Sequence, residues 1–507
     1  MPVDRTPYRR AVKALALLAV VLALYPLVRA FYAFEIDYNE GWNGYLQLRA
    51  AAGLPLYAGY PATFANNYPP LAFHVIGWLG GLTGDPVLAG RLVSMAALAG
   101  ITMACGFIVR SAGGSRCDGT LASVTCLLLF GCFATDYLGM NDPQLLGQAL
   151  GMAGLAVWLS GGNERPYRAA MAALLLAASV LIKHNLILLP LLVAWDALRH
   201  GSRRAGVSLI GTGTVTGIIA FALIHALNGP VFLEQLLAPR TWQVDRAFLF
   251  TSEVLERLAA PVVVVGLGLI AARRVRPAGL VLLWLVAAIG LGAYFSGGAG
   301  TDINVWFDLY LALAVGAGLV AREARARGAT AMVMAALALT INAGALMHAP
   351  LGLGRFGVDA AGDMAERERL FAQDRAYLAA IPGPALCQSH LLCLRAGKPI
   401  NVDAFNTTQA ILTGRLPADT LTGMIEDKRF TVVQVSDLPA ASLNDAPGVQ
   451  AMPPRFVNLT DDVFAALERH YVLDRVGVSG RFYRPRASSQ QATTAALRSA
   501  QLPEMRR

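Results

Sequence analysis

Two carboxylates, Asp37 and Glu40, lie in a short acidic segment, DYNEGWN at 37–43, directly after the first apolar run of the chain. A second polar segment, NNYPPL at 66–71, follows in the same loop. Carboxylates placed just outside a membrane boundary are suited to general acid–base chemistry on a substrate. The pattern predicts an integral membrane enzyme that works at the outer face of the bilayer.

The composition agrees with a membrane protein. The chain has 507 residues, of which 55% are hydrophobic and 15% charged, whereas a soluble protein has roughly 25% charged residues. The net charge of +9 could indicate nucleic acid or an anionic surface as partner. The distribution of the charges decides between these alternatives.

Apolar runs long enough to span a bilayer predict about eleven transmembrane helices. The runs lie at 11–31, 86–109, 118–135, 144–160, 168–182, 185–198, 206–227, 254–272, 278–296, 303–321 and 329–348. The first run is longer than the apolar part of a signal peptide and lacks a clear cleavage site, so we expect a retained helix. The segment 69–82 is too short to cross and is expected at the interface.

Basic residues precede the first run and then fall in every other loop, which the positive-inside rule assigns to the cytoplasm. They are Arg5, Arg9, Arg10, Lys13, Arg110, Arg116, Arg165, Arg168, Arg199, Arg203, Arg204, Arg273, Arg274, Arg276, Arg322, Arg325 and Arg327. The positive charge is therefore explained by topology, and we expect no nucleic-acid partner. The N-terminus is predicted to be cytoplasmic, and the loops with unusual polar residues to be outside.

The composition changes near residue 350, where long apolar runs give way to charges, prolines and alternating patterns. In this part we expect a buried strand at 431–436 and an amphipathic helix at 364–381. We expect three parts: a transmembrane domain at 1–349, an α/β domain outside the cell at 350–485, and a disordered tail at 486–507. The fold class is thus a membrane all-α bundle with a small C-terminal α/β domain. Cys387 and Cys393 lie in that domain, where an oxidising compartment permits a disulfide.

Several motifs in chain order resemble the GT-C superfamily of multi-spanning glycosyltransferases, which includes protein O-mannosyltransferases and aminoarabinose transferases. These motifs are D-x-x-E-G at 37–41, G-x-x-L-Y at 53–57, N-Y-P-P-L at 67–71, a turn with Asp142, LIKHN at 181–185 and GTDINVWFD at 300–308. The C-terminal segments AGKPINVDAF at 396–405 and IEDKRFTVVQV at 425–435 are similar to those of uncharacterised bacterial members.

The resemblance implies transfer of a hexose or pentose from a polyprenyl-phosphate donor, with inversion, to an acceptor outside the plasma (inner) membrane. The acceptor would be a glycan, lipid or protein of the cell envelope. In such enzymes the base is an aspartate of the first outer loop, and Asp37 is the matching position. Some members have an adjacent Asp-Glu pair where this chain has Asn39-Glu40, so Glu40 is the second candidate. Both carboxylates could also simply cap or pair within the loop.

Other polar residues on the same side are candidates for substrate binding. Asp142 fits either an N-cap or an acceptor contact. Lys183, beside His184, is a candidate to bind the donor phosphate; alternatively, its side chain extends to the membrane interface. Arg240 and Arg246 fit phosphate or an ion pair with Asp245. The remaining candidates are Asn304, Asp308 and Tyr68; Asp308 could instead bond within the bundle.

No cofactor is required with certainty, because a lipid phosphate supplies the leaving group. A divalent ion held by Asp37, Glu40 and Asp142 remains open. Two other classes of function are also open. A transporter or flippase would explain polar residues at membrane depth, although internal repeats are not evident. A membrane-anchored binding or sensory protein would use the C-terminal domain.

Overall fold

The computed structural model describes residues 6–57, 63–436 and 458–486. The described chain forms two compact units, one of 6–57 and 66–368 and one of 63–65, 369–436 and 458–486. The predicted disordered tail at 486–507 lies almost wholly outside the described residues. The first unit is helical, and the second is a mixed α/β unit, as expected for the fold class.

The first unit begins with elements of the following bounds: α1 (Thr6–Arg29), α2 (Asn39–Ala51), α3 (Leu71–Thr83), α4 (Pro86–Ser111), α5 (Arg116–Phe133), η1 (Thr135–Tyr137), α6 (Gln144–Val157), η2 (Trp158–Gly162), α7 (Pro166–Ile182), α8 (Leu188–His200) and α9 (Arg203–Asn228). It continues with α10 (Val231–Leu236), α11 (Val244–Ala271), α12 (Arg276–Ser296), η3 (Ile303–Trp306), α13 (Phe307–Ala326), α14 (Ala331–Ile341), α15 (Ala343–Val358) and η4 (Asp359–Asp363).

Eight helices of the described residues are long and apolar enough to span a membrane, or nine if the pair bent by 58° after Ile341 counts as one span. The predicted number of eleven is therefore not confirmed. Two of the expected spans are only 17 and 13 residues long, α7 and α8, because the polar LIKHN segment separates them. The run at 329–348 is broken, since α14 ends at Ile341.

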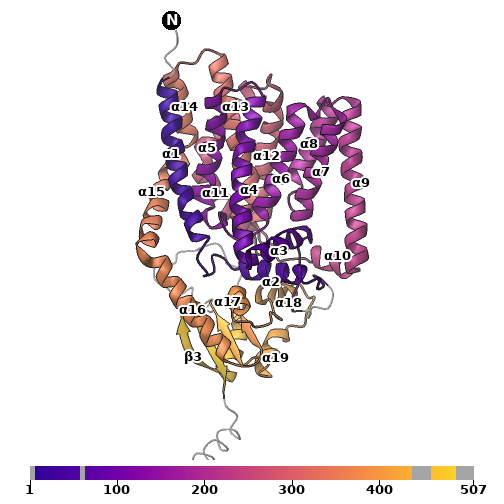
Figure 1. The fold of residues 1–507 in the computed structure, drawn as a ribbon, viewed down its shortest axis with the longest axis vertical. Coiled ribbons are helices and arrows are strands. Elements are labelled where there is room, and N and C mark those ends of the chain that lie inside the picture. Colours follow the sequence, from indigo (N-terminus) through magenta and orange to yellow (C-terminus); the bar gives the residue numbers. More distant parts are fainter. Residues whose placement is uncertain (1–5, 58–62, 437–457, 487–507) are drawn as a thin grey trace, which may run out of the picture. The chain divides into compact units, whose positions relative to one another are not determined.

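Burial distinguishes the centre of the bundle from its edge. In the apolar window of the span formed by η3 and α13, 78% of residues are buried, but in that of α9 only 6% are. The central packing includes edge-to-face contacts of the Phe130 ring with the rings of Phe307 and Tyr310. α9 packs on α7 at the periphery and leaves most of its apolar surface exposed (Figure 1).

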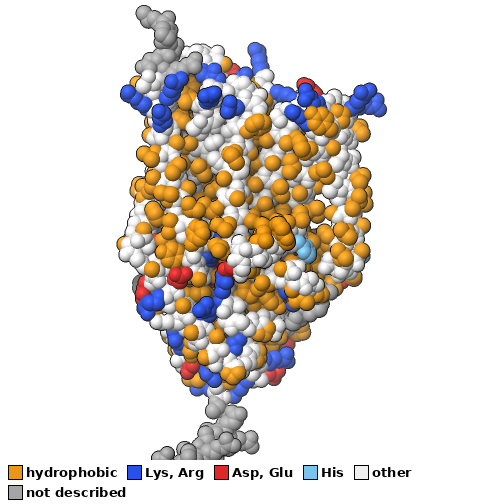
Figure 2. All heavy atoms as spheres, viewed as in Figure 1, with side chains coloured by type: hydrophobic (Ala, Val, Ile, Leu, Met, Phe, Trp, Pro, Cys, Tyr) orange, Lys and Arg blue, Asp and Glu red, His pale blue; other side chains and the backbone are white. Residues whose placement is uncertain are grey.

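The short helices α2, α3 and α10 lie at the end of the bundle opposite the start of α1 (Figure 1). Lys and Arg side chains gather at the end where α1 begins, and hydrophobic side chains cover the sides of the helices (Figure 2). Local signals set the helix ends here. Gly84 ends α3 with φ of 74°, a conformation that glycine adopts without strain, and the Asp85 side chain accepts a hydrogen bond from Val87 N at 2.9 Å to start α4.

The second unit is built on a four-stranded sheet in the order β1-β2-β4-β3, with β1 parallel to β2 and the other pairs antiparallel. Its elements are β1 (Ala385–Cys387), α17 (His390–Arg395), α18 (Ala404–Leu412), α19 (Thr420–Glu426), β2 (Val432–Val435), α21 (Asp461–His470), β3 (Tyr471–Gly477) and β4 (Gly480–Pro485); α16 (Met364–Ala380) leads into it. The predicted strand at 431–436 and helix at 364–381 are confirmed. Cys387 and Cys393 form a disulfide.

Candidate active site

The first loop is held in place by one buried cation, Arg91 of α4. Its guanidinium donates hydrogen bonds to the backbone oxygens of Ala30 at 3.3 Å and Phe34 at 2.8 Å, and also to that of Tyr32. Arg91 is 3% exposed. The loop backbone therefore curves around a fixed charge, which determines where its acidic residues lie.

Glu40 is the carboxylate partner of this cation. Its two oxygens accept hydrogen bonds from Arg91 Nε at 2.7 Å and Nη2 at 2.6 Å. They also accept from the backbone N–H groups of Ile36 at 2.8 Å and Asn141 at 3.0 Å. Because Glu40 is fully buried and bound on both oxygens, its geometry suits an anchor of the loop.

Asp37 lies in the same loop but is only partly buried. One oxygen accepts a hydrogen bond from Asn39 N at 3.0 Å. Burial, with the negative charges of Asp302, Asp142 and Glu40, raises the pKa of the Asp37 carboxyl to about 6, although the Asn39 N–H lowers it. A carboxylate with this pKa is a stronger base than ordinary aspartate and is still ionised at neutral pH.

Asp302 and Tyr137 also lie near Asp37. Neither is among the site residues predicted from the sequence. Burial raises the pKa of Asp302, and a hydrogen bond with Tyr137 lowers it. Burial, followed by the charges of Asp302, Asp142 and Asp37, raises the pKa of the Tyr137 hydroxyl. Three carboxylates therefore lie around one phenol. In the sequence, Asp302 lies within the GTDINVWFD motif and Tyr137 lies in the turn at 136–143, so these two segments could have indicated them.

Asp142 pairs with Lys183. Lys183 Nζ lies 3.3 Å from Asp142 Oδ1 and 4.7 Å from the centre of the Tyr68 ring. Burial by itself lowers the pKa of Lys183, but the Asp142 carboxylate and Tyr68 raise it above the ordinary value, so the amine is charged. Asp142 Oδ1 also accepts from Gln144 N at 2.7 Å at the start of α6. Among the described residues, Asp142 Oδ2 is buried and has no hydrogen-bond partner.

The turn before Asp142 is fixed by a pair of amides. Gln47 Nε2 donates to Asn141 Oδ1 at 2.8 Å, and Asn141 Nδ2 donates to Gln47 Oε1 at 2.9 Å. A β-carbon at Gly90 would lie 1.7 Å from Asn141 Oδ1, so this contact requires glycine in α4. Asp142 is thereby positioned by both α2 and α4.

His184 and Arg240 lie in the loops that follow α7 and α10, and Arg246 lies in the first turn of α11. Burial, then the charges of Lys183 and Arg240, lowers the pKa of His184 to about 4, so this side chain is neutral at physiological pH. Arg240 donates to Ala299 O at 3.4 Å. Arg246 donates to Thr301 O at 2.7 Å and Thr301 Oγ1 at 3.1 Å, and also to Ser296 O. Neither arginine has Asp245 as its partner in these bonds.

Asn304 and Asp308 differ in their surroundings. Asn304 Nδ2 donates to Gln144 Oε1 at 3.3 Å, and Gln144 is two residues after Asp142 in the sequence. Asp308 Oδ1 accepts from Trp284 Nε1 at 2.9 Å, a bond within the bundle. Asn304 therefore lies beside the Asp142 turn, and Asp308 lies one turn further along the chain.

A metal site is not formed by the described residues, which contain no group of three or more His, Cys, Asp or Glu side chains able to hold an ion. The set considered from the sequence, Asp37, Glu40 and Asp142, is not brought together for this purpose. Glu40 is bound by Arg91, and Asp142 is paired with Lys183.

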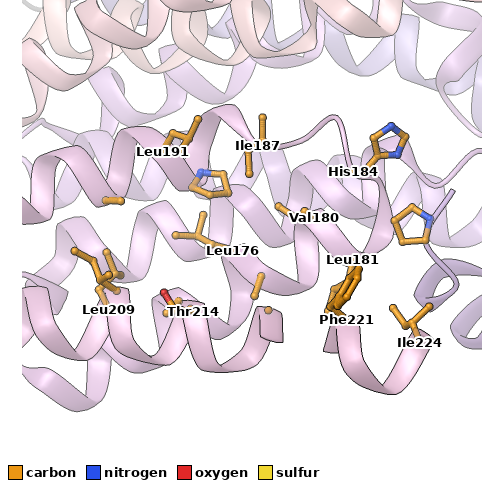
Figure 3. Close-up of a pocket in the computed structure, with 18 of the residues that line it drawn as sticks. Leu176, Val180, Leu181, His184, Ile187, Leu191, Leu209, Thr214, Phe221 and Ile224 are labelled. Carbon is orange, nitrogen blue, oxygen red and sulfur yellow. The ribbon is translucent and has the colours of Figure 1, made fainter. Parts of the chain in front are cut away.

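An apolar groove of about 460 Å³ lies between α7, α8, α9 and α10. His184 lies at one end and Leu209 at the other, with Leu176, Leu191 and Phe221 among the side chains along it (Figure 3). The lining on α9 runs from Leu209 to Ile224, which is roughly 22 Å at 1.5 Å per residue. The groove thus connects the neighbourhood of Lys183 to the apolar sides of the bundle.

Comparisons with known proteins identify solved structures with a similar fold. No protein-family model and no curated protein sequence matches the chain. Among solved structures, ArnT from Cupriavidus metallidurans has 15% identity and a TM-score of 0.58, covering 92% of this chain and 97% of that one. The same protein bound to undecaprenyl phosphate has a TM-score of 0.57 at 15% identity, with 92% and 98% covered.

The archaeal oligosaccharyltransferase AglB from Archaeoglobus fulgidus, in complex with an inhibitory peptide and a dolichol-phosphate, has 10% identity and a TM-score of 0.54. The match covers 93% of this chain and 74% of that one. ArnT and AglB are both GT-C membrane glycosyltransferases. The resemblance seen in the motifs is therefore confirmed at the level of structure, and this chain has the GT-C fold.

Proposed function

We propose that this protein is a membrane glycosyltransferase that moves a sugar from a polyprenyl-phosphate donor to an acceptor of the cell envelope, with Asp37 as the base. The main support is the arrangement of one partly buried carboxylate of raised pKa, a cluster of cations and a long apolar groove in the same helical unit. The GT-C fold of ArnT and AglB, whose structures contain polyprenyl or dolichol phosphates, agrees with this proposal.

The reaction has a simple balance of bonds. A hydroxyl or amine of the acceptor attacks the anomeric carbon, and the bond from that carbon to the phosphate oxygen breaks. The electron pair leaves with the polyprenyl phosphate, and Asp37 takes the proton of the acceptor. Attack from the side opposite the phosphate inverts the anomeric centre.

Asp37 suits the role of base better than Glu40. The oxygens of Glu40 are bound by Arg91, whose permanent charge favours the carboxylate without freeing it for a substrate. Asp37 is partly exposed, and its pKa of about 6 allows it to accept a proton near neutral pH. Glu40 instead holds the loop in which Asp37 lies.

In this proposal the phosphate of the donor binds beside Lys183, His184 and Arg240. The charges of Lys183 and Arg240 both act on His184, which lies at the end of the groove. A neutral His184 adds a hydrogen-bond donor without a charge. The lipid chain follows the groove from His184 toward Leu209, because the apolar side chains of the lining pack against it by van der Waals contact.

Orientation follows from the charges. The Lys and Arg side chains gather at the end where α1 begins, opposite α2, α3 and α10 (Figures 1 and 2). By the positive-inside rule this end is cytoplasmic, and the candidate active site faces outward. The donor would therefore be used on the outer side of the plasma membrane.

The groove makes a prediction about the length of the lipid. Gly213 lines the groove roughly 16 Å along α9 from Ile224, and a β-carbon there would lie 3.9 Å from Ala173 Cβ. Gly213→Leu is expected to raise KM for a long-chain donor about tenfold, because losing roughly ten carbon–carbon packing contacts costs about 1.5 kcal/mol. KM for a donor whose chain ends before Gly213 is expected to stay unchanged.

Gly211→Leu is the matched control. A β-carbon at Gly211 meets nothing within 4 Å, and this residue is not part of the groove lining. Both substitutions replace glycine by leucine in the same helix, so they have similar effects on helix propensity. Equal KM changes for short and long donors in the Gly213 variant would place the lipid chain elsewhere.

The donor class is tested with purified protein in lipid, a panel of radiolabelled polyprenyl-phosphate sugars, and membrane extract as acceptor. The proposal predicts that at least one donor loses its sugar to an acceptor, and that Asp37→Asn prevents this without loss of folded protein. A panel that stays intact with the parent protein would exclude this donor class.

A further inference from the structure

A small polar cavity of about 20 Å³ lies between α6, α8, α12 and α13. Three amide side chains and one carboxyl line its polar part, from Gln144, Asn185, Asn304 and Asp308. The rest of the lining is apolar, with Leu186 and Leu291 among its residues. A cavity of this size has room for about one water-sized oxygen atom.

Two oxygen atoms of this lining have no partner. Asn185 Oδ1 and Asn304 Oδ1 are buried and accept no hydrogen bond from any described residue. Asn304 is 9% exposed, and its nitrogen is already directed to Gln144 Oε1 at 3.3 Å. Buried polar atoms are nearly always hydrogen-bonded, so these acceptors require a donor that the described protein does not supply.

The cavity adjoins the proposed active site. Gln144 N donates to Asp142 Oδ1 at 2.7 Å, and that oxygen is 3.3 Å from Lys183 Nζ. Asn185 is two residues beyond Lys183 in the same loop. A ligand whose phosphate lies near Lys183 therefore has the cavity beside its first groups, where the sugar is attached.

We propose that this cavity receives the hydroxyl of the hydroxymethyl group of a hexosyl donor, which donates to Asn304 Oδ1 or Asn185 Oδ1, while the methylene lies at the entrance of the cavity. The inference rests on the function proposed above and adds the class of sugar. The mixed lining fits such a group, since the methylene contacts apolar side chains and the oxygen contacts amides. The small volume excludes larger substituents, such as an N-acetyl group, at this position.

A hexosyl donor consequently reacts faster than the matched pentosyl donor, which lacks the hydroxymethyl group on the same ring and lipid. The expected ratio of kcat/KM is on the order of 10², because the pentosyl donor leaves one more amide oxygen unpaired and the cavity unfilled. Water in the cavity would reduce the ratio without removing it, since water restores only the hydrogen bonds.

The test compares the two donors with the parent protein and with Asn304→Leu. The parent is expected to prefer the hexosyl donor, and Asn304→Leu to lower the ratio of kcat/KM for the hexosyl donor to that for the pentosyl donor at least tenfold. Asn228→Leu is the matched control, because Asn228 lies outside the cavity and, among the described residues, its amide donates to Ile224 O of its own helix, α9, at 2.9 Å. This variant is expected to keep the preference of the parent.

The outcomes separate the two proposals. Equal use of both donors by the parent protein, or an equal loss for both donors in Asn304→Leu, would overturn the hydroxymethyl pocket and leave the transferase function in place. Consumption of neither donor by the parent would overturn both. The comparison of donors with the parent protein needs no variant to fold.

Discussion

Replacement of Asp37 by Asn is expected to lower kcat by about 10²–10⁴, which is the usual contribution of a general base. The folded protein should be retained, because Asn keeps an oxygen that can accept the hydrogen bond from Asn39 N. Initial rates of sugar transfer and thermal unfolding in detergent measure the two effects separately. A rate within tenfold of the parent, in folded protein, would exclude Asp37 as the base.

The pH dependence tests the same residue without a substitution at position 37. The base is active as the carboxylate, and the pKa of Asp37 is raised to about 6, so kcat/KM should rise as the pH increases through about 6 and level off above it. Asp302→Asn removes a negative charge that raises this pKa and should move the midpoint to lower pH. If the midpoint stays the same in Asp302→Asn, the pH profile does not report the ionisation of Asp37.

Replacement of Arg91 in α4 by Met is expected to lower the free energy of unfolding by about 3–5 kcal/mol, because it leaves Glu40 of the first loop as a buried charge without a partner. Backbone oxygens of Ala30 and Phe34 would lose their donor as well. Thermal unfolding of the purified variant measures this loss. Glu40→Gln together with Arg91→Met should recover part of it, since the uncompensated charge is removed.

Arg469→Met provides the contrast. Arg469 also forms an ion pair, with Glu426 at 3.4 Å, but the two side chains are 65% and 45% exposed. Exposed pairs contribute about 0–1 kcal/mol, so this variant should unfold close to the parent. If Arg91→Met unfolds at the temperature of Arg469→Met, then the Glu40–Arg91 pair is not an anchor of the loop.

The sequence was informative where a signal is local. Apolar runs placed most of the helices, and the residue patterns predicted the buried strand β2 (Val432–Val435) and the helix α16 (Met364–Ala380). The number of spans was less predictable. Hydropathy does not show whether runs as short as 168–182 and 185–198 each cross the bilayer, or that the helix after Ala331 ends at Ile341.

The arrangement of the site could not be read from spacing. Asp37 and Glu40 are three residues apart and equally acidic, and only the fold brings Arg91 of α4 to Glu40. Asn185 and Asn304 lie far apart in sequence, yet both line one cavity. Such relations depend on helix packing, which one sequence does not specify. The motifs did predict which loops would contribute, but not which side chain would bind another.

The most direct test of transfer, as opposed to transport, follows the donor itself. Vesicles containing the purified protein are given a polyprenyl-phosphate sugar labelled in both its sugar and its phosphate, together with an acceptor extract. The proposed function predicts release of free polyprenyl phosphate in the same molar amount as sugar gained by the acceptor, and neither product with Asp37→Asn. Intact donor that has moved to the opposite leaflet, with no polyprenyl phosphate released, would contradict it and identify a flippase.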